Sequence, residues 1–403
     1  MRRPVSQRDA LSSQLETHSR CNRKETGMKK DSTEKPAQAT AGKSSPRSTK
    51  RLQGRLTIGL DLGDRSSRYC MLNEAGETVS EGTMATTRKG LDQLFGRMPR
   101  SRVALEVGGH SPWVSRHLGR LGHEVIVANP RKVRLITQSS RKSDRLDAQA
   151  LARLARVDPE LLSPVRHRGE AAQMDLMRIR ARAVLVEART MLINSARGLA
   201  KSCGERLAGG DAKYVNESLM EPLSEPLRQA LGPLLAQVRS LTEQIEACDQ
   251  QIRQLAHERY PETGRLMQIR GVGPLIALTY VLTVDDPTRF RRSRDAGCYV
   301  GLRPRRRQSG GRDPEMHISK EGDPYLRKLL VQGAHYILGP FGPDTNLRRW
   351  GLRLAARGNK NAKKRARVAV ARKLAVLLHH LWVSGEGYEP LRVSQPPVAA
   401  AAA

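Results

Sequence analysis

Two short apolar segments that each carry one carboxylate constrain this chain more than any other feature of its sequence. Residues 56–62 read Leu-Thr-Ile-Gly-Leu-Asp-Leu, residues 103–107 read Val-Ala-Leu-Glu-Val, and a glycine closes each run. Runs of this length and composition predict strands that are buried in a sheet. A carboxylate in such a strand is costly unless it is paired or holds a metal ion. Asp61 and Glu106 are therefore candidate functional residues.

The pattern around these two segments predicts an α/β domain over residues 55–165. We expect further strands at residues 68–72, 78–84 and 125–128, and helices at residues 88–98, 111–121 and 143–157. Ser111 is suited to cap the second of these helices, with Pro112 in its first position. Three strands followed by alternating helices and strands predict a mixed sheet covered by helices.

Two more carboxylates open the last helix of this domain. Asp144 and Asp147 are three residues apart, so they project from the same helix face. Together with Asp61 and Glu106 they can converge at one edge of the sheet. Carboxylate oxygens suit Mg²⁺ or Mn²⁺, and such ions support phosphoryl transfer. The alternative for Asp144 and Asp147 is ordinary charge at a helix N-terminus, which the macrodipole favours.

The middle of the chain, residues 170–260, predicts two long amphipathic helices with a coiled-coil-like seam. Apolar and small residues recur at three- and four-residue spacing in two series: Met174, Met177, Ala181, Val184, Ala188, Met191, Ser195 and Leu199, and then Leu227, Leu231, Leu234, Val238, Leu241, Ile245, Cys248, Ile252 and Leu255. Gly209-Gly210-Asp211 and the prolines at 222 and 226 mark the break between them. These helices are expected to pack on each other or on another subunit.

The C-terminal region, residues 261–388, combines a glycine turn with a strong positive charge. Residues 266–277 predict a helix-hairpin-helix, in which the turn glycines bring backbone N–H groups close to a phosphate; the alternative is a plain turn between helices. Residues 289–373 contain 23 Lys and Arg against 6 Asp and Glu, which predicts a phosphate-binding surface. The candidate nucleic-acid contacts are Gly271, Gly273, Arg303, Arg305, Arg306, Arg307, Arg312, Lys320 and Arg327.

Ser309 lies between two arginine clusters and is followed by two glycines. A serine hydroxyl is a poor nucleophile, but neighbouring arginines can bind a phosphate and stabilise the charge that develops on it. A phosphoserine intermediate would keep the phosphodiester energy for rejoining. The residues alone leave a simple phosphate-binding or turning loop as the alternative. His317 and His335 are expected to be structural or to contact nucleic acid.

Composition narrows the partners and the compartment. The net charge of +31 calls for a polyanionic partner, most simply nucleic acid. No apolar run is long enough to span a membrane, and five scattered cysteines predict neither disulfides nor a zinc site, so a cytoplasmic protein is expected. Residues 1–54 predict a disordered basic arm, in which Met28 is a possible alternative start, and residues 389–403 a disordered tail.

Several motifs in fixed order identify a resemblance to a known family. Gly59-Leu60-Asp61, Ala104-Leu105-Glu106 and residues 142–148 (Lys-Ser-Asp-Arg-Leu-Asp-Ala) resemble the DEDD motif of insertion-sequence transposases with a RuvC-like, RNase H-like domain. Residues 269–274, 299–304, 309–311 and 318–323 resemble the C-terminal half of the same proteins. The whole pattern is similar to insertion sequence family 110, whose recombinases are guided by a bridge RNA.

The resemblance implies a bacterial DNA recombinase. Asp61, Glu106, Asp144 and Asp147 would bind Mg²⁺ in the RuvC-like domain, and Ser309 in a mainly α-helical C-terminal domain would form a 5′-phosphoserine link. The implied partners are donor and target DNA, a structured non-coding bridge RNA, and further copies of the chain, from dimer to tetramer. The two sites would come from different subunits, and RNA pairing would choose the DNA sequence.

Two other functions fit parts of the sequence. A RuvC-like, structure-selective nuclease would use the four carboxylates without a covalent step, and Ser309 would then belong to a binding element. A non-catalytic basic protein would leave the buried carboxylates unexplained. An actin-like ATPase, which Gly59-Leu60-Asp61-Leu62-Gly63 would suit, is excluded because no second phosphate loop follows.

Overall fold

A mixed sheet of five strands forms the N-terminal part of this computed structural model, which describes residues 55–133, 143–215, 217–312, 314, 316–358 and 360–391. The strands are β1 (Thr57–Asp61), β2 (Ser66–Leu72), β3 (Thr78–Ala85), β4 (Arg102–Glu106) and β5 (Glu124–Ala128), in the order β3-β2-β1-β4-β5. β1 is antiparallel to β2 and parallel to β4, and β5 is parallel to β4. The predicted mixed sheet is confirmed.

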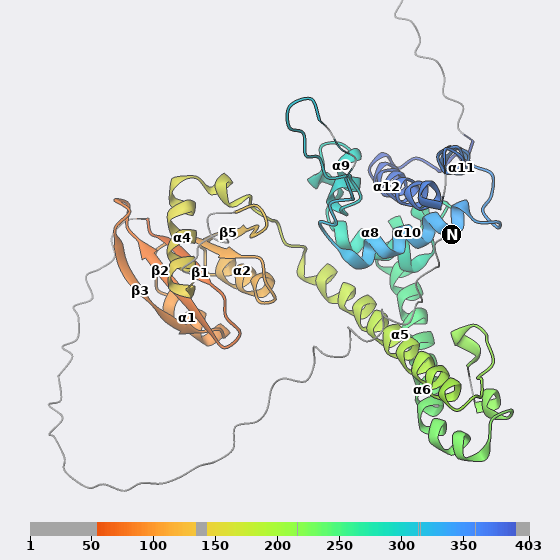
Figure 1. Cartoon of the computed structure of the whole chain (residues 1–403). Coiled ribbons are helices and arrows are strands. Elements are labelled where there is room, and N and C mark those ends of the chain that lie inside the picture. The colour runs from red at the N-terminus through yellow and green to blue at the C-terminus, as the bar shows by residue number, and fades with distance from the viewer. Residues whose placement is uncertain are drawn as a thin grey trace, which may run out of the picture. The chain divides into compact units, whose positions relative to one another are not determined.

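Helices cover both faces of this sheet (Figure 1). α1 (Arg88–Phe95) and α2 (Ser111–Arg120) pack on the face that carries Ile58, Leu60 and Leu105. α4 (Asp144–Val157) packs on the opposite face through its alanines and Leu151, because Gly59 and Ala104 leave room for it there. Because successive side chains of a strand point to opposite faces, the sheet separates two apolar layers.

The start of α2 differs from the expectation. Ser111 is the first residue of the helix, and His110 precedes it without a capping side-chain bond. The Ser111 hydroxyl donates instead to the carbonyl of Gly108 and accepts from its N–H. Ser111 therefore fixes the turn after β4 rather than the first turn of the helix. In α4, by contrast, the Ser143 hydroxyl accepts from the N–H of Leu146, as an N-cap does.

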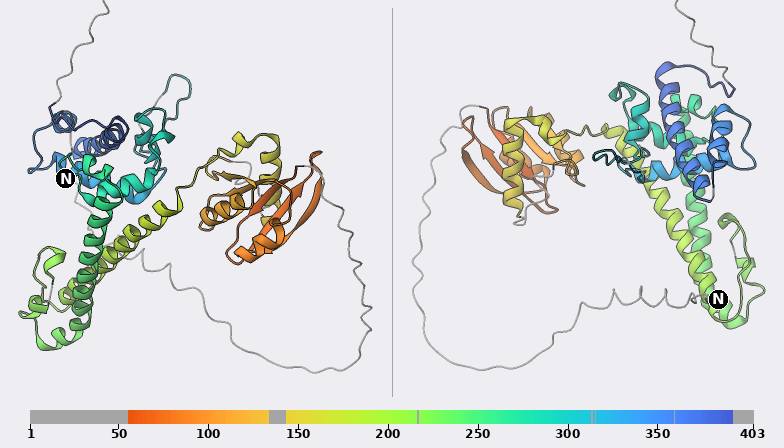
Figure 2. Two further views of the ribbon diagram at one scale, coloured as in Figure 1. Left: turned by 180° about the vertical axis from the view of Figure 1, so that it is seen from behind. Right: turned by 45° about the horizontal axis from the view of Figure 1, so that its top comes forward.

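Two long helices follow, α5 (Glu170–Ser202) and α6 (Glu225–Glu258), and they lie side by side in both views of Figure 2. Arg182 pairs with Asp249, and Arg189 donates to Thr242, across the helix pair. The predicted break falls between these helices, except that Pro226 lies inside the first turn of α6, where a proline costs no hydrogen bond.

The predicted apolar face is correct for most of α6 and wrong for α5. In α6, Leu235 is buried in place of the predicted Leu234, which is half-buried. α6 buries Leu227, Leu231, Val238, Ile245 and Leu255. The apolar residues that α5 buries are alanines and a few larger residues, and the alanines allow the two backbones to approach. They are Ala172, Leu176, Ile179, Ala183, Ile193, Ala196 and Ala200. The larger residues of its predicted series are at least half exposed: Met174, Met177, Val184, Met191 and Leu199.

The rest of the described chain is mainly helical. Its helices are α7 (Glu262–Leu266), α8 (Pro274–Val284), α9 (Arg294–Tyr299), α10 (Pro324–Leu338), α11 (Asn346–Ala355) and α12 (Lys360–Ser384). Tyr280 is fully buried in their common core and donates its hydroxyl to the carbonyl of Ala375. Within the described ranges, no helix is long and apolar enough to cross a membrane.

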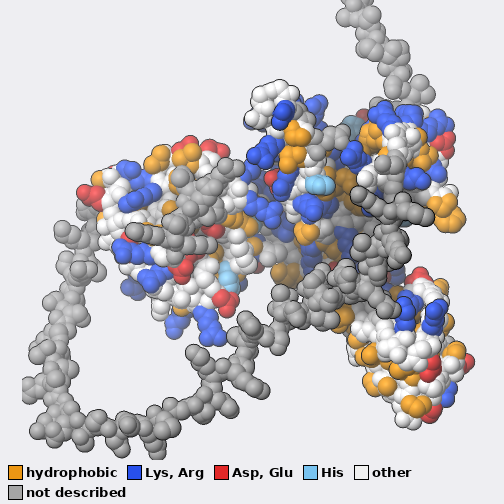
Figure 3. Space-filling view, viewed as in Figure 1, with side chains coloured by type: hydrophobic (Ala, Val, Ile, Leu, Met, Phe, Trp, Pro, Cys, Tyr) orange, Lys and Arg blue, Asp and Glu red, His pale blue; other side chains and the backbone are white. Residues whose placement is uncertain are grey.

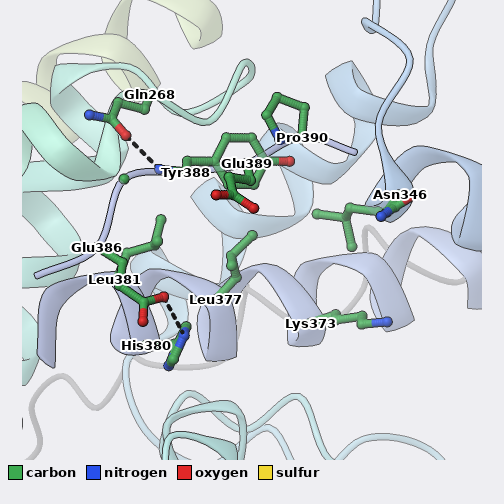
Figure 4. A pocket seen from close by; sticks show the side chains of 12 residues that line it. Gln268, Asn346, Lys373, Leu377, His380, Leu381, Glu386, Tyr388, Glu389 and Pro390 are labelled. Carbon is green, nitrogen blue, oxygen red and sulfur yellow. Dashed lines mark hydrogen bonds and ion pairs between the residues drawn. The ribbon is translucent and has the colours of Figure 1, made fainter. Parts of the chain in front are cut away.

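Residues 386–390, partly in the predicted tail, pack against the end of α12 (Figure 4). Tyr388 donates its N–H to Gln268, Asn346 donates its N–H to the carbonyl of Pro390, and His380 lies 3.5 Å from Glu386. A cavity of about 640 Å³ remains between this segment and the helix. Residues 392–403, like the predicted basic arm, lie outside the described residues.

Candidate active site and nucleic-acid interface

The four predicted carboxylates lie at one edge of the sheet. β1 and β4 are parallel neighbours, and their register ends with Leu60 beside Leu105, so Asp61 and Glu106 follow on adjacent strands. Both belong to the face that carries Gly59 and Ala104, which is the face covered by α4. The two strand carboxylates therefore lie on the α4 side of the sheet.

The direction of α4 brings the other two carboxylates to the same edge. The carbonyl of Ala155, near the end of α4, accepts a hydrogen bond from Arg102, the first residue of β4. α4 therefore runs opposite to β1 and β4, and its first turn lies near the ends of these strands. Asp144 and Asp147 stand one turn before the buried residues Ala148 and Leu151, so both carboxylates are on the helix face that meets the sheet.

The side chains themselves are not closed into a metal cage. Asp61, Glu106 and Asp147 are half-buried, Asp144 is exposed, and the Oε1 atom of Glu106 is shielded from solvent. Among the described residues, no three His, Cys, Asp or Glu side chains are grouped so that they could hold a metal ion. An all-carboxylate donor set at one sheet edge fits a divalent cation in ligand chemistry, and ion binding requires these side chains to move together.

A pair formed by a histidine and an aspartate at this edge was not predicted from the sequence. Trp113 Nε1 donates to His110 Nδ1 at 3.0 Å, which leaves the proton on Nε2, and that atom lies 3.4 Å from Asp64. Asp64 follows β1 and His110 follows β4, so the pair lies beside the carboxylates. Asp64, which follows the glycine at the end of the first apolar run, could have indicated the pair, but its partner is 46 residues away in the sequence.

The second predicted site, Ser309, lies at the exposed tip of a hairpin arm formed by residues 301–312, 314 and 316–320. Ser309 and Arg312 exchange two backbone hydrogen bonds of 3.2 Å, so Gly310 and Gly311 form a two-residue turn. Gly310 has φ +56°, a conformation that glycine adopts without strain. Pro304 pairs with Ile318 nearer the base of the arm. The exposed Ser309 is thus presented on a short, defined turn.

Close backbone contacts hold the base of this arm. A Cβ added to Gly301, whose φ is +72°, would lie 2.0 Å from the carbonyl oxygen of Glu321. Arg327 donates to the carbonyls of Val300 and Glu321, and Arg305 donates to the carbonyl of Ser319. Partial burial lowers the pKa of Arg327. Two of the predicted nucleic-acid contacts therefore also brace the arm.

Exposed positive side chains are spread along the whole arm, from its base to the turn at Ser309. Arg303, Arg305, Arg306, Arg307, Arg312 and Lys320 are all exposed. Figure 3 shows Lys and Arg side chains in number over the C-terminal region on the face drawn. His317 is exposed, and its carbonyl accepts from the N–H of Arg305. This arrangement favours contact with phosphates.

The two predicted turn glycines have different surroundings. Gly271 has φ +97° and lies against Tyr336, Ile337 and Gly333 of α10, so its freedom of conformation and lack of a side chain serve helix packing. Gly273 precedes α8, is exposed, and has no atom within 4 Å of an added Cβ. Only Gly273 leaves the open backbone approach that a phosphate needs.

Comparisons with known proteins relate both halves of the chain to transposases. A family model described as "Transposase" of the IS110 DEDD type matches residues 58–203, and one described as "Transposase IS116/IS110/IS902 family" matches residues 263–345. The first match includes all four carboxylates, and the second includes Ser309.

Individual relatives extend over most of the chain. A probable family 20 transposase of Pseudomonas aeruginosa is 31% identical over 343 residues, which cover 83% of this chain and 98% of the relative. A putative transposase of Sinorhizobium fredii is 31% identical and covers 83% of this chain and 85% of its own length. The transposase for insertion sequence element IS1111A of Coxiella burnetii is 29% identical, with 82% and 90% covered.

Proposed function

Since this chain belongs to the IS116/IS110/IS902 family of transposases, enzymes that cleave and join DNA, we propose that it works through a metal-binding carboxylate edge and a covalent serine. The proposal is supported by the placement of Asp61, Glu106, Asp144 and Asp147 at the same edge of one sheet. Four carboxylates repel a DNA phosphate unless a cation offsets their charge. Mg²⁺ or Mn²⁺ bound there would stabilise negative charge on the phosphate oxygens during phosphoryl transfer.

Ser309 supplies the nucleophile in this proposal. Its Oγ loses its proton and attacks a DNA phosphorus, the bond from phosphorus to the 3′ oxygen breaks, and the leaving 3′ oxygen takes up a proton to become a 3′-OH. A 5′-phosphoserine link remains. The exposed Arg303, Arg306 and Arg312 bind the phosphate and stabilise its developing charge. Attack of a different 3′-OH on the phosphoserine restores a phosphodiester and frees the serine, so no energy source is needed for joining.

A structured RNA guides the choice of DNA sequence in this proposal. The basic C-terminal region supports binding to nucleic-acid backbones, which is independent of sequence. Aromatic residues make up only 3% of the chain, so stacking platforms for reading single-stranded bases are sparse. Base pairing between a bridge RNA and the DNA would supply the missing specificity.

A second copy of the chain covers the exposed stripe of α5. Met177, Val184 and Met191 repeat every seven residues and are half exposed or more. A strict seven-residue apolar repeat is typical of a helix that packs on a partner helix. Assembly through this stripe would let the carboxylate edge of one subunit act with Ser309 of another.

The test is to incubate the full chain with its flanking non-coding RNA, Mg²⁺ and end-labelled donor DNA, and to look for an SDS-resistant protein–DNA adduct. We expect the adduct in the wild type and its loss in Ser309→Ala. Asp61→Asn is expected to abolish cleavage and to leave nucleic-acid binding intact. Asp92→Asn, which removes an exposed carboxylate of α1, is the matched control. Wild-type cleavage by Asp61→Asn would contradict the assignment of the carboxylate edge.

A RuvC-like nuclease without a covalent intermediate is the second candidate. It is favoured by the hydrogen bonds between Ser309 and Arg312, which use backbone atoms and do not activate the hydroxyl. If DNA is cleaved without an adduct, and Ser309→Ala cleaves as well as the wild type, the protein is this nuclease.

A further inference from the structure

A long segment near the C-terminus carries positive charge without any acidic residue. Between Asp344 and Glu386 the chain has 11 Lys and Arg and no Asp or Glu. This segment includes the whole of α11 and α12. Ordinary solvated helix faces mix charges of both signs, so an excess of one sign over two neighbouring helices indicates a polyanionic partner.

Some of these cations have structural tasks. Arg348 donates to the carbonyls of Ile337 and Gly339, Arg349 pairs with Asp344, and Lys373 lies 4.4 Å from the centre of the Trp350 ring. The positive groups nearer the turn between α11 and α12, Arg353, Arg357, Lys363, Lys364 and Arg365, are exposed. Exposed positive charge is therefore concentrated at this end of the helix pair.

A hollow of about 510 Å³ lies between α11 and α12 at this end. The helices approach closely at Gly351, where an added Cβ would lie 2.5 Å from Val370. Beyond this contact, the lining of the hollow combines small and apolar residues, including Leu354, Ala362, Ala366 and Ala369, with Arg357 and Arg365. Guanidinium groups can bind phosphate oxygens, and the small side chains leave room for a nucleic-acid backbone.

We infer that this α11–α12 groove binds the phosphodiester backbone of a double-stranded nucleic acid, at a place separate from the Ser309 arm. The inference rests on the proposed function, because it assigns one more contact to the same nucleic-acid assembly. The described residues that line the hollow include no aromatic side chain on which single-stranded bases could stack, which favours a duplex as the ligand. Guanidinium groups instead form paired hydrogen bonds with phosphate oxygens of any sequence.

The experiment compares the salt dependence of binding for two double variants of the full chain. Arg357→Gln with Arg365→Gln removes two charges from the groove, and Lys201→Gln with Arg206→Gln removes two exposed charges from the end of α5 and the segment after it. Binding to a short random-sequence DNA duplex, an RNA duplex of the same sequence and oligothymidylate is followed by fluorescence anisotropy across a salt series.

We expect the groove variant to lower the slope of log K against log salt by about 2 for at least one duplex, because each lost phosphate contact contributes about 0.9. The duplex that responds identifies the source of the backbone, DNA or RNA. Arg357→Lys with Arg365→Lys keeps the charge and should keep the slope. The inference would be overturned by any of three results. These are an unchanged slope in the groove variant, an equal change of slope in the Lys201 and Arg206 variant, and a lower slope for oligothymidylate alone.

The outcome is independent of the covalent chemistry. Ser309→Ala removes the adduct and should leave the duplex slope unchanged. If the wild type forms no adduct but the groove variant has a lower slope of log K against log salt, the proposed chemistry fails and the groove assignment stands.

Discussion

At the scale of single residues, Gly59 sets the distance between α4 and the sheet. An added Cβ there would lie 1.9 Å from the carbonyl oxygen of Ala148 and 2.6 Å from the nitrogen of Ala152, both backbone atoms. Gly59→Ala must therefore push α4 away and move Asp144 and Asp147 from the strand carboxylates. We expect the free energy of unfolding to fall by about 1–3 kcal/mol. We also expect DNA cleavage to be lost.

Chemical denaturation and cleavage assays measure the two effects of Gly59→Ala. Gly108→Ala is the control, because no atom lies within 4 Å of its added Cβ. Equal stability and cleavage in the two variants would contradict the close packing of α4 on β1.

His167 gives a residue-scale prediction for pH. Burial, together with the charges of Arg116 and Arg168, lowers the pKa of His167, whose Nε2 lies 3.0 Å from the Ser111 hydroxyl. The unfolded chain then takes up a proton near the ordinary pKa of about 6.5 while the folded chain does not. The stabilisation is therefore complete above that pH and falls as the pH drops toward the lowered value. In His167→Gln, the free energy of unfolding should depend less on pH below 6.5, as denaturation at a series of pH values would show; an unchanged dependence would contradict this.

At the scale of elements, the sequence predicted what depends on local pattern. The sheet, α4 with its Ser143 cap and the buried face of α6 follow from alternation and from three- and four-residue spacing, and the structure confirms them. The face of α5 could not be found this way. Its alanines allow close approach to α6, and that contact outweighs the larger residues on the other face. The pair of Asp64 and His110 was missed because it joins distant segments.

The hairpin arm supports another element-scale prediction. Gly301→Ala would force its Cβ against the backbone of Lys320 and Glu321, and φ +72° strains any other residue there. We expect the arm to lose its fixed base, so that adduct formation at Ser309 falls by on the order of tenfold or more, as expected for a displaced catalytic group. Binding to duplex should persist. Gly264→Ala, with no atom within 4 Å of the added Cβ, is the control, and full adduct formation in Gly301→Ala would contradict a positioning role for the base.

At the scale of the whole molecule, the sequence identified the order of the parts and could not identify their assembly. The motifs around Asp61 and Ser309 lie in different parts of the chain, and each can be recognised from nearby residues alone. In the proposed mechanism, their joint action would depend on which copies of the chain meet. The exposed stripe of α5 is the feature of the described structure that bears on this point, since single exposed apolar residues are common but a regular row of them is not.

The stripe therefore predicts the mass of the protein in solution. Met177→Gln, Val184→Gln and Met191→Gln together remove apolar surface without changing the charge or the small residues that face α6. We expect light scattering to show the wild type as a dimer or a larger assembly, and the triple variant at the 44.7 kDa of one chain. A control with Val79→Gln, Val157→Gln and Val383→Gln, which are exposed but scattered, should keep the wild-type mass. An assembly that survives the loss of the stripe would mean that another surface joins the subunits, and Ser309 would then have to reach a carboxylate edge without help from α5.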